Sequence, residues 1–133
     1  MKPLIIAPTD KTPSVTFDAD SGVFEIKGRS IPKDAEEFYA STLDWLESYK
    51  LKPNEETVVS FNLEFFNISS SKRILFILYK LNEIVEAGHK VNVRWTTLEN
   101  DDDMFEVGQD YAFMVNIPFE FIQTAKKEKA LVA

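Results

Sequence analysis

The sequence predicts an α/β domain in which one mixed β-sheet carries helices packed on it, in the order β-β-α-β-α-β-α-β. Three observations lead to this fold class. Several short segments alternate apolar and polar residues with the period of two that is typical of strands. Two longer segments repeat apolar residues at the helical period instead. These segments follow one another at short intervals, which favours right-handed parallel crossovers.

The first predicted elements are a hairpin and a helix. Residues 14–18 and 23–28 are alternating runs, and the four residues Ala19-Asp20-Ser21-Gly22 between them are typical of a turn. After Pro32, apolar residues recur at helical spacing up to Tyr49. We therefore expect an amphipathic helix from about Pro32 to Tyr49.

The middle of the chain carries the best-defined strand and helix. An alternating run over 58–66 predicts a strand, and its core face is expected to carry Val59, Phe61, Leu63 and Phe65. From Ser70 to Ala87 a broad apolar stripe predicts a helix. Gly88 then stands where a glycine commonly ends a helix.

The last third of the chain predicts a strand over 90–96, a third helix after the acidic run 99–103, and a final strand over 118–122. A chain of 133 residues fits one domain. We expect residues 1–133 to form a single domain with loosely ordered ends at 1–12 and 125–133.

Composition excludes several kinds of partner. Fifteen Lys and Arg against 22 Asp and Glu give a net charge of −7, which repels nucleic acid and anionic membranes. No apolar run approaches the roughly 20 residues of a membrane span. The chain has no cysteine, which fits a reducing compartment, so we expect a cytoplasmic protein.

Three hydroxyls open the predicted helix at 70–87. Ser69, Ser70 and Ser71 follow the strand directly, and a phosphate on one of them would lie near unpaired N–H groups at the helix start. The alternative is that one serine is simply the N-cap. Ser69 and Ser70 are the candidate phosphoacceptors.

Neither catalysis nor a metal or cofactor site is expected. The single histidine, His89, lies at the far end of the predicted helix from the serines, roughly 25 Å away. This distance disfavours a Ser-His-Asp triad. The acidic residues Asp101, Asp102 and Asp103 lack an EF-hand pattern and are explained by helix capping. Four glycines are too few for a phosphate-binding loop.

Residues beside the serines are candidates for docking a partner. Glu64 is a carboxylate inside a predicted strand, which needs solvent, a partner protein, or an ion pair with Lys72 or Arg73. Phe66 and Ile68 flank Asn67 at the strand-to-helix turn, and apolar side chains beside hydroxyls are common on docking surfaces. The predicted partner-binding residues are Glu64, Phe66, Asn67, Ile68, Ser71 and Lys72.

The stretch Leu63-Glu64-Phe65-Phe66-Asn67-Ile68-Ser69-Ser70 resembles the signature of the SiaC-type bacterial regulatory phosphoproteins, in which Leu-Glu-(Tyr or Phe)-Phe-Asn-Thr-Ser-Ser is expected. Asp44-Trp45-Leu46 and Ala87-Gly88-His89-Lys90-Val91 also match, in order and spacing. The resemblance covers nearly the whole chain. It implies a fold like that of the STAS anti-sigma-factor antagonists, that is, a STAS-like single mixed sheet.

The resemblance also implies a partner-switching protein that is no enzyme itself. A serine/threonine kinase would phosphorylate it, a PP2C-type phosphatase would restore it, and in one state it would bind and activate a diguanylate cyclase. The family's acceptor is commonly the threonine after the asparagine, and this position is Ile68 here. Either the acceptor is Ser69 or the switch is lost, and we favour Ser69.

Two other functions remain open from the sequence. One is a small-ligand carrier with a pocket between the first helix and the sheet, lined by Trp45 and phenylalanines. The other is a hydrolase using Ser69 or Ser70, which the distant histidine disfavours. The sequence leaves the oligomeric state undetermined.

Overall fold

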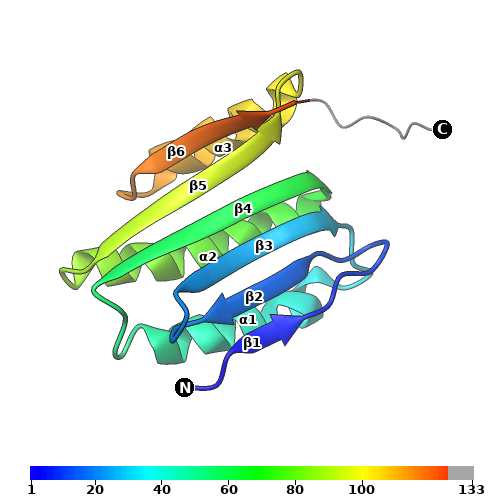
Figure 1. Ribbon diagram of the computed structural model, residues 1–133. Coiled ribbons are helices and arrows are strands. Elements are labelled where there is room, and N and C mark those ends of the chain that lie inside the picture. The colour runs from blue at the N-terminus through cyan, green and yellow to red at the C-terminus, as the bar shows by residue number, and fades with distance from the viewer. Residues whose placement is uncertain (126–133) are drawn as a thin grey trace.

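The computed structural model describes residues 1–125 and contains one six-stranded sheet with three helices (Figure 1). The spatial order of the strands is β1-β2-β3-β4-β5-β6. Antiparallel pairing joins β1, β2 and β3, and parallel pairing joins β3, β4, β5 and β6. The elements are β1 (Leu4–Ile6), β2 (Ser14–Asp18), β3 (Val23–Ser30), α1 (Ala35–Tyr49), β4 (Glu56–Phe66), α2 (Ile68–Glu86), β5 (Lys90–Leu98), α3 (Asp102–Met114) and β6 (Phe119–Thr124).

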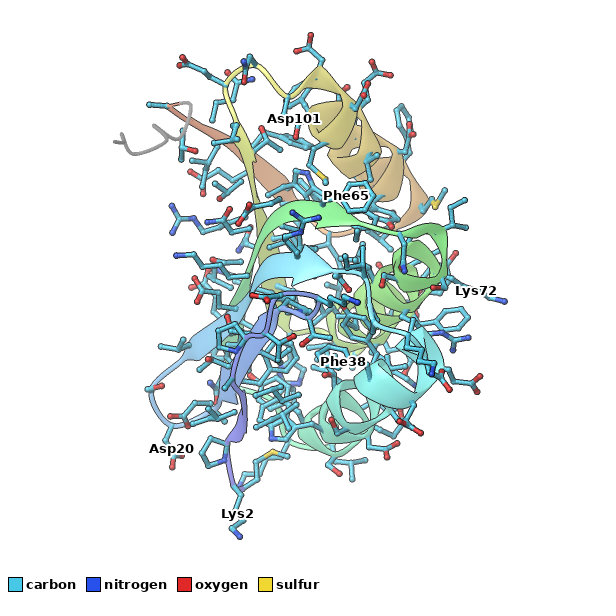
Figure 2. All side chains as sticks on the ribbon, turned by 90° about the vertical axis from the view of Figure 1, so that its right-hand side faces the viewer. Lys2, Asp20, Phe38, Phe65, Lys72 and Asp101 are labelled. Carbon is cyan, nitrogen blue, oxygen red and sulfur yellow. The ribbon has the colours of Figure 1, made fainter. Side chains whose placement is uncertain are left out.

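All three helices cover the same face of the sheet, as the side view in Figure 2 shows. Each strand turns alternate residues toward them, so Val59, Phe61 and Leu63 of β4 are buried while Ser60 between them is only half-buried. The other face has no helix over it and is mainly polar. The predicted fold class and the mixed sheet are therefore confirmed.

The core lies between the sheet and the helices. Trp45 of α1 packs against Phe17, Phe24 and Tyr49, with ring centroids 5.1 to 5.9 Å apart. These rings fill the space in which the sequence placed a ligand pocket for a carrier. Trp45 lines none of the five main pockets of residues 1–125, so the structure gives no support to the expected carrier pocket.

Strand β1 was not predicted. It pairs with β2 at Leu4 with Phe17 and Ile6 with Val15, and the Trp45 indole N–H donates to the Lys2 carbonyl at 2.8 Å. Three apolar residues between prolines are too few to show a period, so only the tertiary contact makes them a strand. The expectation of a loosely ordered start therefore does not hold for residues 4–6. At the other end, 126–133 lie outside the described residues.

The helix boundaries differ slightly from the sequence prediction. Helix α1 begins at Ala35 rather than Pro32, because the Asp34 carboxylate caps it by accepting from the Glu37 N–H at 3.1 Å. Helix α2 ends as expected. Gly88 has φ +99°, and its N–H and that of His89 donate to the Val85 and Ile84 carbonyls, which is a Schellman motif.

A β-bulge changes the end of β4. Gly28 of β3 pairs with Leu63, and the next residue, Arg29, pairs with Phe65, so Glu64 is an extra residue in β4. The bulge reverses the facing of the residues that follow. Phe65, which alternation placed in the core, is 50% exposed. That part of the prediction is wrong.

Candidate phosphorylation and docking site

The turn between β4 and α2 is fixed by Asn67. Its backbone N–H donates to the Ser30 carbonyl at 3.0 Å, which ties the turn to the end of β3. Its side-chain oxygen accepts from the Ser70 N–H at 2.9 Å, so Asn67 is the N-cap of α2 and the helix begins at Ile68. The serines therefore lie within the first turn of the helix, and none of them is the cap.

Ser70 is fully buried and structural. Its hydroxyl donates to the Ser30 carbonyl at 3.1 Å and accepts from the Ser30 hydroxyl at 2.9 Å. The Ser30 hydroxyl is also hydrogen-bonded to the Tyr39 hydroxyl at 2.6 Å. Burial raises the pKa of Tyr39 to about 12, against the smaller opposing effect of its hydrogen bond to Ser30. These three side chains join β3, α1 and α2 beneath the turn.

Ser69 is the exposed serine of the three. Its hydroxyl makes one long hydrogen bond, to the Asn67 side-chain oxygen at 3.2 Å. The hydroxyl of Ser71, which is only half-buried, donates to the Ile68 carbonyl at 2.6 Å. The turn thus presents Ser69 to solvent, holds Ser71 against the helix, and encloses Ser70.

Apolar side chains surround this turn unequally. Ile68 is 90% exposed and Phe65 is 50% exposed. Phe66 is half-buried and stacks on Tyr111 of α3 with ring centroids 6.5 Å apart. The Tyr111 hydroxyl donates to the Ser71 carbonyl at 2.9 Å, and burial raises the pKa of Tyr111 above its usual range. Ile68 and Phe65 are therefore the accessible apolar residues, whereas Phe66 secures the turn to α3.

Charged residues at the turn are not paired with one another. Glu64 and Lys72 are exposed, and the salt bridges among residues 1–125 do not include Glu64, Lys72 or Arg73. The ion pair considered from the sequence is therefore absent there. The Lys72 ammonium and the Arg73 guanidinium lie 5.8 and 5.1 Å from the Phe76 ring centroid instead.

Other candidate residues lie as the sequence suggested. His89 follows the C-terminus of α2, at the opposite end of that helix from the serines. Asp101 caps α3 by accepting from the Met104 N–H at 3.1 Å, with Asp102 and Asp103 in the first turn. Residues 1–125 contain no cluster of three or more His, Cys, Asp or Glu able to hold a metal. Nor does any helix of this part combine the length and apolarity of a membrane span.

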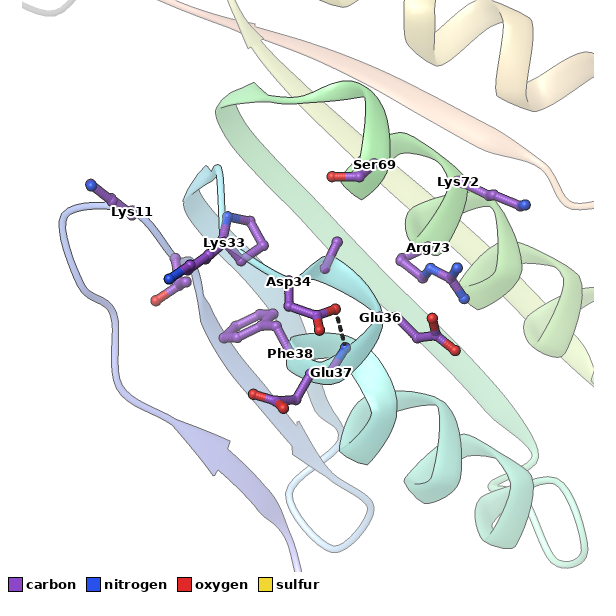
Figure 3. Close-up of a pocket in the computed structure, with 12 residues that line it drawn as sticks. Lys11, Lys33, Asp34, Glu36, Glu37, Phe38, Ser69, Lys72 and Arg73 are labelled. Atoms are coloured by element: carbon purple, nitrogen blue, oxygen red, sulfur yellow. Dashed lines mark hydrogen bonds between the residues drawn. The ribbon is translucent and has the colours of Figure 1, made fainter.

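Sequence reasoning missed two parts of this site. Exposed Phe65 results from the bulge, and its only sequence signal is that Phe65 and Phe66 are successive aromatic residues where alternation calls for one. A pocket of about 830 Å³ also lies between the first turns of α1 and α2, with Ser69 on its wall (Figure 3). Its α1 side is more than 30 residues away in sequence, so no local pattern indicates it.

An exposed serine in the first turn of a helix, beside accessible apolar side chains, is the kind of site that a regulatory phosphoprotein carries. Comparison of this chain with known proteins supports the same class. The model of the SiaC family of regulatory phosphoproteins matches residues 6–124, and the chain belongs to that family.

Two solved structures and one curated protein sequence are similar to this chain. Apo-SiaC from Pseudomonas aeruginosa has 25% sequence identity and a TM-score of 0.84, over 92% of this chain and 99% of that one. The diguanylate cyclase SiaD in complex with its activator SiaC, from the same organism, matches with a TM-score of 0.85 and 25% identity over 91% of this chain and 99% of that one. An uncharacterised protein of Pseudomonas aeruginosa strain UCBPP-PA14 is 26% identical over 119 residues, covering 90% of this chain and 94% of its own length.

Proposed function

We propose that this protein is a phosphorylation-controlled partner switch whose acceptor is Ser69, and that it binds and activates a diguanylate cyclase in one phosphorylation state. Family membership and the SiaD–SiaC complex support the kind of output partner. The observation that carries the choice of acceptor is the unequal exposure of the three serines, because a kinase must reach the hydroxyl that it modifies.

Regulation needs two further partners, a serine/threonine kinase and a PP2C-type phosphatase. The kinase transfers the γ-phosphoryl group of ATP to Ser69 Oγ, which releases ADP and the hydroxyl proton. The phosphatase hydrolyses the phosphoserine to serine and inorganic phosphate. The domain supplies the acceptor and the docking surface and has no catalytic part in either step.

The partner surface is centred on Ile68. This side chain and Phe65 are exposed apolar groups on either side of the turn, and Glu64 and Lys72 add charge beside them. Phosphorylation adds a charge of about −1.5 to −2 at the adjacent Ser69. That charge lies within reach of whatever covers Ile68, so it changes the affinity for the partner.

Labelling with the cognate kinase and ATP tests the acceptor. We expect one phosphate per chain on Ser69, no labelling of Ser69→Ala, and normal labelling of Ser71→Ala. Phosphorylation should change the affinity for the cyclase by about 5- to 150-fold. If mass spectrometry finds no phosphate on residues 69–71, with this kinase or in the native host, the chain is a constitutive binding module instead.

Binding measurements test the docking surface separately. Ile68→Ser should weaken cyclase binding because it removes the most exposed apolar side chain of the turn. Phe113→Ser is the matched control, since Phe113 is 91% exposed on α3 and is not part of this turn. Equal affinities of the Ile68→Ser variant and the unchanged protein would place the interface elsewhere.

A further inference from the structure

The pocket beside Ser69 has walls from two helices. Residues before and within the first turn of α1 form one wall, and Ser69, Lys72 and Arg73 of α2 form the other. In Figure 3 the Ser69 hydroxyl points across the pocket toward the α1 side. A group added to Ser69 therefore enters this pocket.

The pocket carries an unusual set of charges. Its cations are Lys11, Lys33, Lys72 and Arg73, and its carboxylates are Asp34, Glu36 and Glu37. Four positive and three negative groups leave a net charge of +1. The Asp34 carboxylate is already engaged in capping α1.

The four cations have no acidic partner among residues 1–125, although other lysines of the same two helices do. At the C-terminal ends of α1 and α2, Lys50 pairs with Glu83 and Lys80 pairs with Glu47, both at 2.6 Å. No salt bridge among the described residues includes a cation of the pocket. The two helices are thus joined by ion pairs at one end and face each other with free cations at the other.

The sequence spacing on α2 favours an anion at Ser69. Lys72 and Arg73 are three and four residues after it, the positions that lie on the same helix face. An anion that precedes its cation by four residues is the favourable order. The Lys72 and Arg73 side chains now lie over the Phe76 ring, so they must change rotamer to reach a phosphate on Ser69.

We propose that the pocket receives the phosphate of phospho-Ser69, and that Arg73 and Lys72 from α2 and Lys33 from the α1 side bind it. This rests on the proposed function, because it concerns the phosphorylated state of the same serine. The phosphate joins the N-terminal ends of α1 and α2, as the ion pairs already join their C-terminal ends.

The three carboxylates oppose this, so the ionisation of the phosphate reports which charges dominate. An unperturbed phosphoserine loses its second proton near pH 6, at a pKa of about 6. Bound cations lower that pKa because they favour the dianion, whereas facing carboxylates raise it. A pKa below the ordinary value is expected here.

Phosphoserine installed at position 69 during translation allows the test without any kinase. A ³¹P NMR titration of the purified protein should give a phosphate pKa below about 6. Arg73→Gln and Lys33→Gln should each raise it toward the ordinary value. Lys90→Gln removes the same charge at the start of β5, away from the pocket, and should leave it unchanged.

The outcomes are distinct. The proposed binding of the phosphate in the pocket is wrong if the phosphate pKa is at or above the ordinary value. It is also wrong if Arg73→Gln and Lys33→Gln leave that pKa unchanged. Circular dichroism checks that each variant is folded. If the phosphate pKa is lowered but the kinase does not label Ser69, the proposed function is refuted. The pocket would still bind a phosphate at this position.

Discussion

Replacing Ser70 by alanine separates a structural serine from a regulatory one. The substitution removes two buried hydrogen bonds, between Ser70 Oγ and the hydroxyl and carbonyl of Ser30. Each is worth about 0.5–1.5 kcal/mol, or about 1–3 kcal/mol together. Both partners keep another bond, because the Ser30 hydroxyl still meets Tyr39 and the Ser30 carbonyl still accepts from the Asn67 N–H. We therefore expect Ser70→Ala to cost about 1–2 kcal/mol.

Urea denaturation measures this loss. With a slope of about 2 kcal/mol per molar, the midpoint should fall by roughly 0.5–1 M at an unchanged slope. Ser69→Ala is the matched control, and its exposed hydroxyl should be worth less than about 0.5 kcal/mol. Kinase labelling of folded Ser70→Ala should persist. The division of roles between these serines is refuted if Ser70→Ala and Ser69→Ala have equal stability. It is also refuted if folded Ser70→Ala is no longer labelled by the kinase while Ser69→Ala still is.

Two further predictions concern α3 and the buried tyrosine. Gly108→Ala should lower the free energy of unfolding by about 1–3 kcal/mol and alter Trp95 fluorescence, because a Cβ at this position would lie 2.5 Å from the Trp95 ring. Ala112→Gly on the same helix is the control for helix propensity. An unchanged urea midpoint for Gly108→Ala would show that α3 does not pack on Trp95. Burial raises the pKa of Tyr39 to about 12, above the ordinary tyrosine value of about 10. Its contribution to stability should therefore be complete below pH 10 and fall as the pH rises toward 12. Ultraviolet titration of Tyr39→Phe against the unchanged protein checks this, and a tyrosine lost from the titration near pH 10 would contradict it.

Periodicity predicted most of the fold because most elements bury one face. The strands predicted at 14–18 and 23–28, of which the second continues to Ser30 in the structure, and the helix ending before Gly88 follow from patterns within a single segment. The start of α2 did not follow, since Asn and Ser are equally good N-caps and the sequence offers Asn67 and three serines in succession. Such choices depend on tertiary contacts, here the bond from Asn67 to Ser30.

The candidate site was predictable only as far as it is local. The position of the serine cluster after a strand was visible, and so was Ile68 beside it. Which serine is buried was not, because a serine side chain is small enough for either environment and its partner Ser30 lies 40 residues earlier. The same distance in sequence separates the two walls of the pocket, so Lys33 could not be connected with Arg73.

The single extra residue at Glu64 places Phe65 on the docking surface instead of in the core. If β4 alternated regularly through Glu64, Phe65 would lie in the interior and Phe66 would face outward. The bulge therefore decides which aromatic ring is offered to a partner, while the strand order and the helices stay in place. A bulge at the end of a strand can change the exposed side chains of a domain without remaking its interior.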